Sequence, residues 1–214
     1  MTNIVRGLTS LLLWSLLSGA HAAEAGATSL EQFFTGLHNL TANFDQTITD
    51  VKGVVTQNAS GKVTIQRPGK FRWDYVTPYE QLVLGDGQHL WTYDADLEQA
   101  TVKPQGDALA GTPASLLSAE EQPSDLFNIA PLPSRHGEDW FELTPKTQQG
   151  LGDTQFNQLR LGFVHGTLVA MELVDAFDQT TLIRFNDLNR NGGVSAMLFD
   201  FTPPAGVDVI GEMP

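Results

Sequence analysis

The sequence has no cysteine among its 214 residues. Disulfide bridges and thiolate metal sites are therefore excluded, and no thiol is present to carry a covalently attached lipid. The histidines after residue 22 are scattered, without the close spacing typical of a zinc site; they are His38, His89, His136 and His165. We expect no metal site.

Basic residues are also scarce. The chain has 12 Lys and Arg against 25 Asp and Glu, which gives a formal net charge of −13 at pH 7. Such a surface repels phosphate backbones and anionic lipid headgroups, so nucleic-acid binding is not expected. An acidic surface also favours solubility, and solubility alone accounts for much of this charge.

Motifs for enzyme chemistry are missing as well. The sequence holds no G-x-S-x-G elbow, no P-loop and no G-x-G-x-x-G. Asp94 and Asp96 could form an acid–base pair, but they fall in a predicted hairpin turn, where aspartate is favoured for local reasons. We therefore expect no catalytic residues and no cofactor.

The apolar run near the start of the chain predicts export. Residues 8–20 are mostly apolar, follow Arg6, and lead into the small-x-small triplet at residues 20–22. This pattern is typical of a secretory signal peptide, and the run is too short to span about 30 Å of hydrocarbon. We expect residues 1–22 to be cleaved after Ala22, and residues 23–214 to form one domain in the periplasm.

Residues 67–103 carry the clearest structural pattern. Phe71, Trp73 and Tyr75 occupy alternate positions, so in a strand their rings share one face. Turn residues separate this run from the next ones, at residues 77–78, 85–87 and 94–96. The segment predicts an antiparallel meander with large rings on one side.

The remaining segments predict a mostly β fold with few helices. Apolar residues at helical spacing favour a helix over residues 29–40, and Thr112-Pro113 is typical of the start of a short helix reaching Leu117. Most other segments alternate as strands do. We expect residues 131–137 to be irregular and residues 199–204 to form the last strand.

A set of short motifs occurs in order along the chain and resembles one known family. The motifs are Arg67 to Trp73, Gln81, Asp86-Gly87, Leu90 to Asp94, Gln99-Ala100, Thr112-Pro113, Phe141 to Lys146 and Phe201 to Val207. Each motif is weak alone, but the ordered set is similar to the outer-membrane lipoprotein carrier protein (LolA) family.

The resemblance implies a fold and a function. The fold would be an incomplete antiparallel β-barrel, a half-barrel, with a lid of short α-helices over its concave face. The protein would be a monomeric periplasmic chaperone. It would receive lipoproteins from an inner-membrane lipoprotein-releasing ABC transporter and hand them to an outer-membrane lipoprotein acceptor.

The physics of the cargo fits the predicted rings. Each methylene left in water costs about 0.8 kcal/mol, so an acyl chain needs an apolar cleft to cross water. We expect acyl chains to bind rings on the concave face and apolar residues of the lid, namely Phe33, Leu37, Phe71, Trp73, Trp91, Leu116 and Leu117. The alternative is that these side chains fill a closed core.

The resemblance also assigns a role to Arg67, that of a latch holding the lid shut. A guanidinium offers five donors and cannot be neutralised, so it can bond to backbone carbonyls of the lid. The alternative is an arginine that caps a surface loop.

Three other functions are consistent with parts of the sequence. An outer-membrane acceptor homologue would share the fold, but the missing cysteine argues against it. A periplasmic half-barrel that senses lipid or peptide would usually carry a further domain. A secreted hydrolase would need a clustered catalytic set, which the sequence does not contain.

Overall fold

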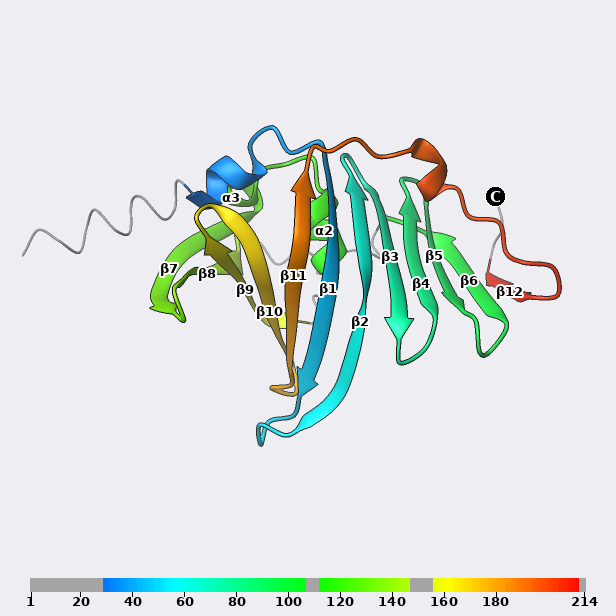
Figure 1. Cartoon of the computed structure of the whole chain (residues 1–214), viewed down its shortest axis with the longest axis horizontal. Coiled ribbons are helices and arrows are strands. Elements are labelled where there is room, and N and C mark those ends of the chain that lie inside the picture. Colours follow the sequence, from blue (N-terminus) through cyan, green and yellow to red (C-terminus); the bar gives the residue numbers. More distant parts are fainter. Residues whose placement is uncertain (1–28, 107–111, 147–155, 212–214) are drawn as a thin grey trace, which may run out of the picture.

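Twelve strands form one curved sheet in the computed structural model, which describes residues 29–106, 112–146 and 156–211 (Figure 1). The order across the sheet is β12-β6-β5-β4-β3-β2-β1-β11-β10-β9-β8-β7. The strands are β1 (Asn39–Thr49), β2 (Val55–Gln66), β3 (Lys70–Thr77), β4 (Gln81–Asp86), β5 (His89–Asp94), β6 (Gln99–Pro104), β7 (Phe127–Arg135), β8 (Glu138–Pro145), β9 (Phe156–Val164), β10 (Thr167–Asp175), β11 (Thr180–Arg190) and β12 (Asp208–Gly211).

The helices are short. They comprise a helix at residues 29–34, α2 (Pro113–Ser118), α3 (Pro123–Leu126) and the 3-10 helix η2 (Ala196–Phe199). Figure 1 views the sheet from its outer face, with α2 behind it. Of the helices in the described ranges, none has the length and hydropathy needed to cross a membrane.

The sheet stays open, which confirms the predicted incomplete barrel. Its edge strands are β7 and β12, which stand at opposite ends of the strand order. Neighbouring strands run antiparallel, apart from β12, which pairs in parallel with β6 through Asp208 to Gly211. The chain therefore forms a curved sheet around a core rather than a closed ring.

Aromatic rings from β1 and β3 meet across β2 on the concave face. The Phe44 ring centroid lies 5.2 Å from that of Trp73 and 5.1 Å from that of Tyr75. Gly61 of β2 pairs with both Phe44 and Tyr75. A Cβ atom on Gly61 would lie 1.9 Å from the Asp74 carbonyl oxygen and 3.0 Å from Phe44 Cε1. The rings can therefore touch because the strand between them carries no side chain there.

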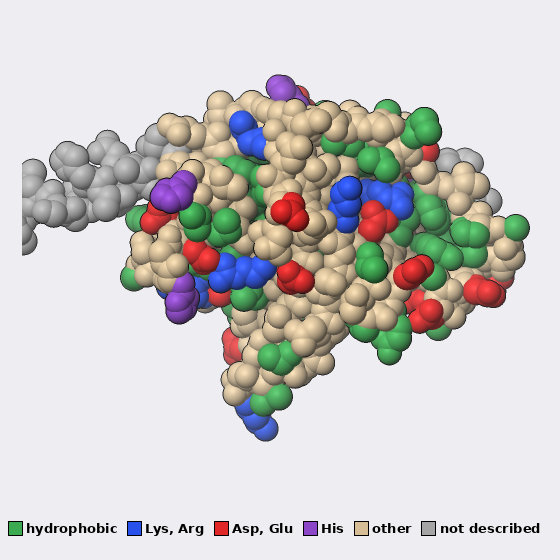
Figure 2. All heavy atoms as spheres, in the orientation of Figure 1, with side chains coloured by type: hydrophobic (Ala, Val, Ile, Leu, Met, Phe, Trp, Pro, Cys, Tyr) green, Lys and Arg blue, Asp and Glu red, His purple; other side chains and the backbone are tan. Residues whose placement is uncertain are grey.

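A second apolar cluster lies on the other face of the sheet, on β4, β5 and β6. It contains Leu82, Leu84, Trp91 and Val102, covered by Tyr93, Phe201 and Val209. Phe201 and Val209 belong to the C-terminal segment, which runs from η2 to β12. Figure 2 shows this outer face, where apolar side chains gather towards the β4–β6 end and charged groups of both signs lie over the middle.

The predicted helix at residues 29–40 is wrong in its length, because the helix spans residues 29–34. Gly36 follows it at φ +66°, a left-handed conformation that ends helices. Leu40, placed on the helix by the sequence pattern, instead pairs with Ile65 and Arg190 within β1. Apolar spacing alone did not separate the helix from the strand that follows.

Two predictions near prolines are also wrong. Residues 131–137 are not irregular, because β7 extends to Arg135; a strand at the sheet edge tolerates Pro131 and Pro133, which have no N–H to donate. Residues 199–204 do not form the last strand. η2 ends at Phe199 and the final strand is β12, further along the chain.

Replacing Gly61 by alanine tests the packing across β2. Gly61→Ala is expected to lower the free energy of unfolding by about 1–3 kcal/mol, because the new Cβ would collide with the Asp74 carbonyl. Urea unfolding would measure the difference. The matched control is Gly106→Ala, where an added Cβ meets nothing within 4 Å. Equal unfolding midpoints for the two variants would contradict this account.

Candidate functional site: an apolar cavity under α2

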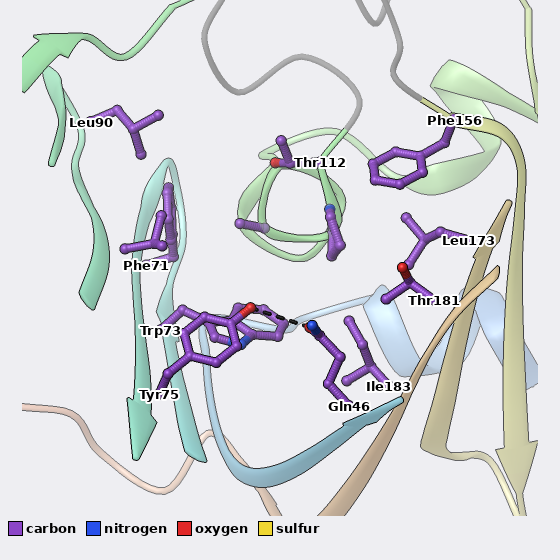
Figure 3. A pocket seen from close by; sticks show the side chains of 13 residues that line it. Gln46, Phe71, Trp73, Tyr75, Leu90, Thr112, Phe156, Leu173, Thr181 and Ile183 are labelled. Carbon is purple, nitrogen blue, oxygen red and sulfur yellow. Dashed lines mark hydrogen bonds between the residues drawn. The ribbon is translucent and has the colours of Figure 1, made fainter. Parts of the chain in front are cut away.

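A cavity of about 270 Å³ lies between the concave face of the sheet and the start of α2 (Figure 3). Its walls come from seven strands, β1, β3, β4, β5, β9, β10 and β11, and from the first turn of α2. Apolar side chains dominate the lining, and none of the described residues that line the cavity is charged. The lining residues are Gln46, Phe71, Trp73, Tyr75, Val83, Leu90, Thr112, Pro113, Ala114, Phe156, Leu173, Thr181 and Ile183.

Strand pairing gives the Phe71 ring its place in the wall. Phe71 pairs with Gly85 of β4, and Gly85 pairs with Leu90 of β5. A Cβ on Gly85 would lie 2.2 Å from Phe71 Cε1. The ring therefore lies over the glycine, and Leu90 extends the same wall beyond it. Any larger residue at position 85 would displace the ring.

The lower end of the cavity carries a polar pair. The Tyr75 hydroxyl donates a hydrogen bond to Gln46 Oε1 at 3.2 Å, linking β3 to β1 across β2 (Figure 3). Burial raises the pKa of Tyr75 to about 12. The phenol is therefore neutral at physiological pH and keeps the proton that it donates.

α2 covers the opposite side of the cavity. Thr112 caps the helix by accepting a hydrogen bond from the Ser115 N–H, and Pro113 follows where no backbone donor is needed. Pro113 and Ala114 face the cavity. At the other end of α2, the Ser118 carbonyl accepts a hydrogen bond from the Gly69 N–H at 2.8 Å. The helix is thereby tied to the β2–β3 turn.

Arg67, in the same turn, connects the two helical parts that cover the concave face. Its Nε donates to the Leu117 carbonyl at 3.1 Å and its Nη1 donates to the Phe34 carbonyl at 3.4 Å. The guanidinium also lies 5.4 Å from the centre of the Phe34 ring. Arg67 thus holds α2 and the helix at residues 29–34 together.

The surroundings of the Arg67 guanidinium do not satisfy it fully. Burial lowers the pKa of Arg67, and the negative charge of Glu121 partly offsets this effect. Within the described part of the chain, Nη2 is buried and has no hydrogen-bond partner. A buried donor without a partner costs free energy, so this linkage is weaker than a fully bonded guanidinium would make it.

Of the side chains predicted to bind acyl chains, Phe71 and Trp73 line the cavity. Phe33, Leu37 and Leu117 are buried in the core cluster around it without lining it. Leu116 faces a smaller neighbouring hollow that Phe127 and Leu159 also line.

The placement of Trp91 on the concave face is wrong. Its ring belongs to the outer cluster, with its centroid 5.4 Å from that of Phe201. Strand alternation explains the error, because Leu90 and Trp91 are adjacent and must point to opposite faces. Leu90 takes the inner position because it pairs with Gly85, which places it in the row of Phe71.

Most of the residues that line the cavity were not predicted from the sequence. Tyr75 could have been assigned to the site, since it continues the alternation of Phe71 and Trp73. Val83 and Leu90 could be assigned to the cavity only from the register of the meander. Phe156, Leu173 and Ile183 carry no local signal, because apolar alternation in β9, β10 and β11 is equally typical of core.

The described residues contain no group of three or more His, Cys, Asp or Glu side chains arranged to hold a metal ion. The functional geometry of the described residues is therefore that of an uncharged apolar cavity with a helix over it.

Comparison with known proteins agrees with this geometry. The family model of the outer membrane lipoprotein carrier protein LolA matches residues 35–202. The outer-membrane lipoprotein carrier protein of Dechloromonas aromatica is 42% identical over 211 residues, covering 98% of this chain and 99% of that protein. The protein of the same name from Methylobacillus flagellatus is 40% identical over 187 residues, covering 87% and 89%.

A solved structure of an uncharacterized conserved protein from Thermus thermophilus shares the fold, with a TM-score of 0.50 at 11% identity, covering 87% of this chain and 97% of that one. The family match and the close relatives extend over most of the described sheet, including β3 and Arg67. The chain therefore belongs to the outer membrane lipoprotein carrier protein LolA family.

Proposed function

We propose that this protein is a periplasmic carrier that shelters the acyl chains of lipoproteins while they cross water. The observation that supports the proposal most directly is the uncharged apolar cavity between the ring-bearing sheet and α2. Family membership supports it independently, since the relatives are named as lipoprotein carriers. The site binds its cargo and makes or breaks no covalent bond.

The cargo explains why such a cavity is needed. At about 0.8 kcal/mol per methylene, leaving a sixteen-carbon chain in water costs about 13 kcal/mol. The rings of Phe71 and Trp73 and the side chains of Leu90, Leu173 and Ile183 offer an apolar surface that removes much of this cost. A lipoprotein anchor can then travel as a soluble complex.

The size of the cavity supports a movement of the lid. About 270 Å³ lies below the roughly 300–1,000 Å³ typical of pockets for small ligands. An anchor with more than one acyl chain needs more space than this. We infer that α2 moves away from the sheet when cargo enters, and that the described structure is the closed form.

Arg67 is the proposed latch of this closed form. Its two hydrogen bonds to lid carbonyls are charge-assisted, a class worth about 1.5–3 kcal/mol each. The bond to Phe34 is long and Nη2 has no partner in the described residues, so the latch lies at the weak end of that range. Cargo can open it, and closure helps to release cargo.

The proposed route runs between two membranes. Residues 1–22, which lie outside the described residues, act as the export signal, and the mature protein works in the periplasm without a lipid of its own. It receives lipoproteins from an inner-membrane ABC transporter and passes them to an outer-membrane acceptor. Adding the purified protein to inner-membrane vesicles with ATP tests this directly: lipoprotein should appear in the soluble fraction, and its retention in the vesicles would refute the proposal.

Filling the cavity should abolish binding without unfolding the protein. Val83 is half-buried and points into the cavity from β4, so the larger ring of Val83→Phe would occupy the space of the ligand. We expect at least a tenfold higher Kd for a fluorescent hexadecanoate ester probe, which carries no charge at its head, measured by titration.

The matched control is Val55→Phe, at an exposed position at the start of β2 outside the cavity. It makes the same chemical change and should leave probe affinity unchanged. If Val83→Phe binds the probe as well as the wild type does, this cavity is not the binding site.

Removing the latch should slow the release of cargo. Arg67→Leu loses both bonds to the lid, so the open form is favoured and the acyl chain is held longer. We expect tighter binding of the hexadecanoate ester probe and several-fold slower transfer of lipoprotein to outer-membrane vesicles. Stopped-flow dissociation and a transfer assay would measure the two effects.

Arg190→Leu provides the control. Arg190 donates from Nε to the Phe33 carbonyl at 3.0 Å and from a second nitrogen to the Thr35 carbonyl, so it holds the helix at residues 29–34 but not α2. Its loss should change transfer little. Equal slowing in both variants would mean that general loosening of the first helix, and not the link to α2, controls release.

A further inference from the structure

The inward faces of three strands change from apolar to polar at the same end of the cavity. Each series begins with apolar side chains. Towards the hairpin turns it ends with a side chain that can form hydrogen bonds. The series are Leu40, Ala42, Phe44 and Gln46 on β1; Phe71, Trp73 and Tyr75 on β3; and Phe185, Ile183 and Thr181 on β11. The last residues of the three series, Gln46, Tyr75 and Thr181, all line the cavity (Figure 3).

Gln46 is the central residue of this polar end. It lies beside Ile183 in the pairing of β1 with β11, and its side chain points between Ile183 and the rings of β3 (Figure 3). Its Oε1 accepts the hydrogen bond of Tyr75, whose raised pKa keeps the phenol protonated as a donor. The amide is therefore oriented, and its oxygen is occupied.

The two N–H groups of the Gln46 amide can donate hydrogen bonds to a ligand. Within the described residues, Nε2 donates to no protein group, although Gln46 is half-buried at the cavity wall. The Thr181 hydroxyl lines the cavity from the neighbouring strand. Nε2 is not among the buried side-chain atoms that lack a partner, so it is accessible from the cavity, and this end of the cavity is suited to a ligand that brings an acceptor.

The residues that line the cavity determine which kind of hydrogen-bond acceptor can bind there. Among the described residues no lysine, arginine or histidine lines the cavity, so a carboxylate placed there would find no countercharge in them. A neutral carbonyl oxygen accepts the amide hydrogens without that cost. An acyl ester has both features, an apolar tail and a neutral carbonyl at its head.

We propose that Gln46, oriented by Tyr75 and flanked by Thr181, forms a subsite for the ester carbonyl of an acylated glycerol. The alkyl tail then lies against Phe71, Leu90 and the first turn of α2. This inference rests on the proposed binding of acyl chains and adds the chemistry that fixes where the chain begins. Gln46 positions the cargo within a site that is otherwise non-directional.

Two variants separate this role from simple strand packing. Gln46→Met keeps the length of the side chain and removes its donors. Tyr75→Phe breaks the same Tyr75–Gln46 hydrogen bond but leaves the amide of Gln46 in place. If the pair only tied β1 to β3, the two variants would behave alike.

The test compares two ligands that differ only in their carbonyl groups, dioctanoylglycerol and the corresponding dioctylglycerol diether. Displacement of the hexadecanoate ester probe from the mature protein gives both affinities. Wild-type protein should bind the diester about three- to tenfold more tightly than the diether, the effect of one hydrogen bond. Gln46→Met should bring this ratio close to one without weakening diether binding, and Tyr75→Phe should lower it only partly, because the amide donors of Gln46 remain but are no longer oriented.

Each contrary outcome has a distinct meaning. Equal affinity of wild-type protein for the two ligands would overturn the subsite, and so would an unchanged preference in Gln46→Met or an equal loss in both variants. Binding of neither ligand to wild-type protein would instead refute the proposed acyl-chain function. The wild-type ratio needs no variant, so the inference is tested even if a substitution prevents folding.

Discussion

The contact of the Phe44 ring with the rings of Trp73 and Tyr75 across Gly61 determines the shape of the interior. These rings come from strands that are not neighbours, and they meet only because β2 carries a glycine between them. Bulky side chains on one face of a curved sheet cannot fill its whole concavity. The space between the rings and the wall of β10 and β11 is the cavity.

α2 has fewer hydrogen bonds to the rest of the molecule than the strands have, although Leu116 and Leu117 also pack it into the core. Each strand is held by a ladder of backbone hydrogen bonds, whereas α2 is fixed to the β2–β3 turn by the bond from Gly69 to Ser118 and by Arg67. Regions with few such attachments open at lower free energy than the rest of a structure. The sheet therefore supplies a firmly held wall, and the cover proposed to move is the separate helix α2.

The alternation of Phe71, Trp73 and Tyr75 was enough to predict the ring-bearing face of an antiparallel meander, whereas the open barrel was implied by the family resemblance. Trp91 could not be placed because Leu90 and Trp91 are both large and apolar, and only the pairing of Leu90 with Gly85 decides which one points inward. The wall from Leu173 and Ile183 was unpredictable for a different reason. Its residues alternate as core residues do, and the distant strands that complete a cavity leave no local trace.

The proposed latch and the proposed cargo differ in energy, and this difference constrains how transfer can occur. Together, the two charge-assisted bonds from Arg67 contribute no more than about 6 kcal/mol. Transferring one sixteen-carbon chain to water costs about 13 kcal/mol. Closure of the lid therefore cannot expel an acyl chain into solvent. It can only shift the balance towards an acceptor that offers the chain an equally apolar surface, so the chain must pass from one protein to the other without crossing water.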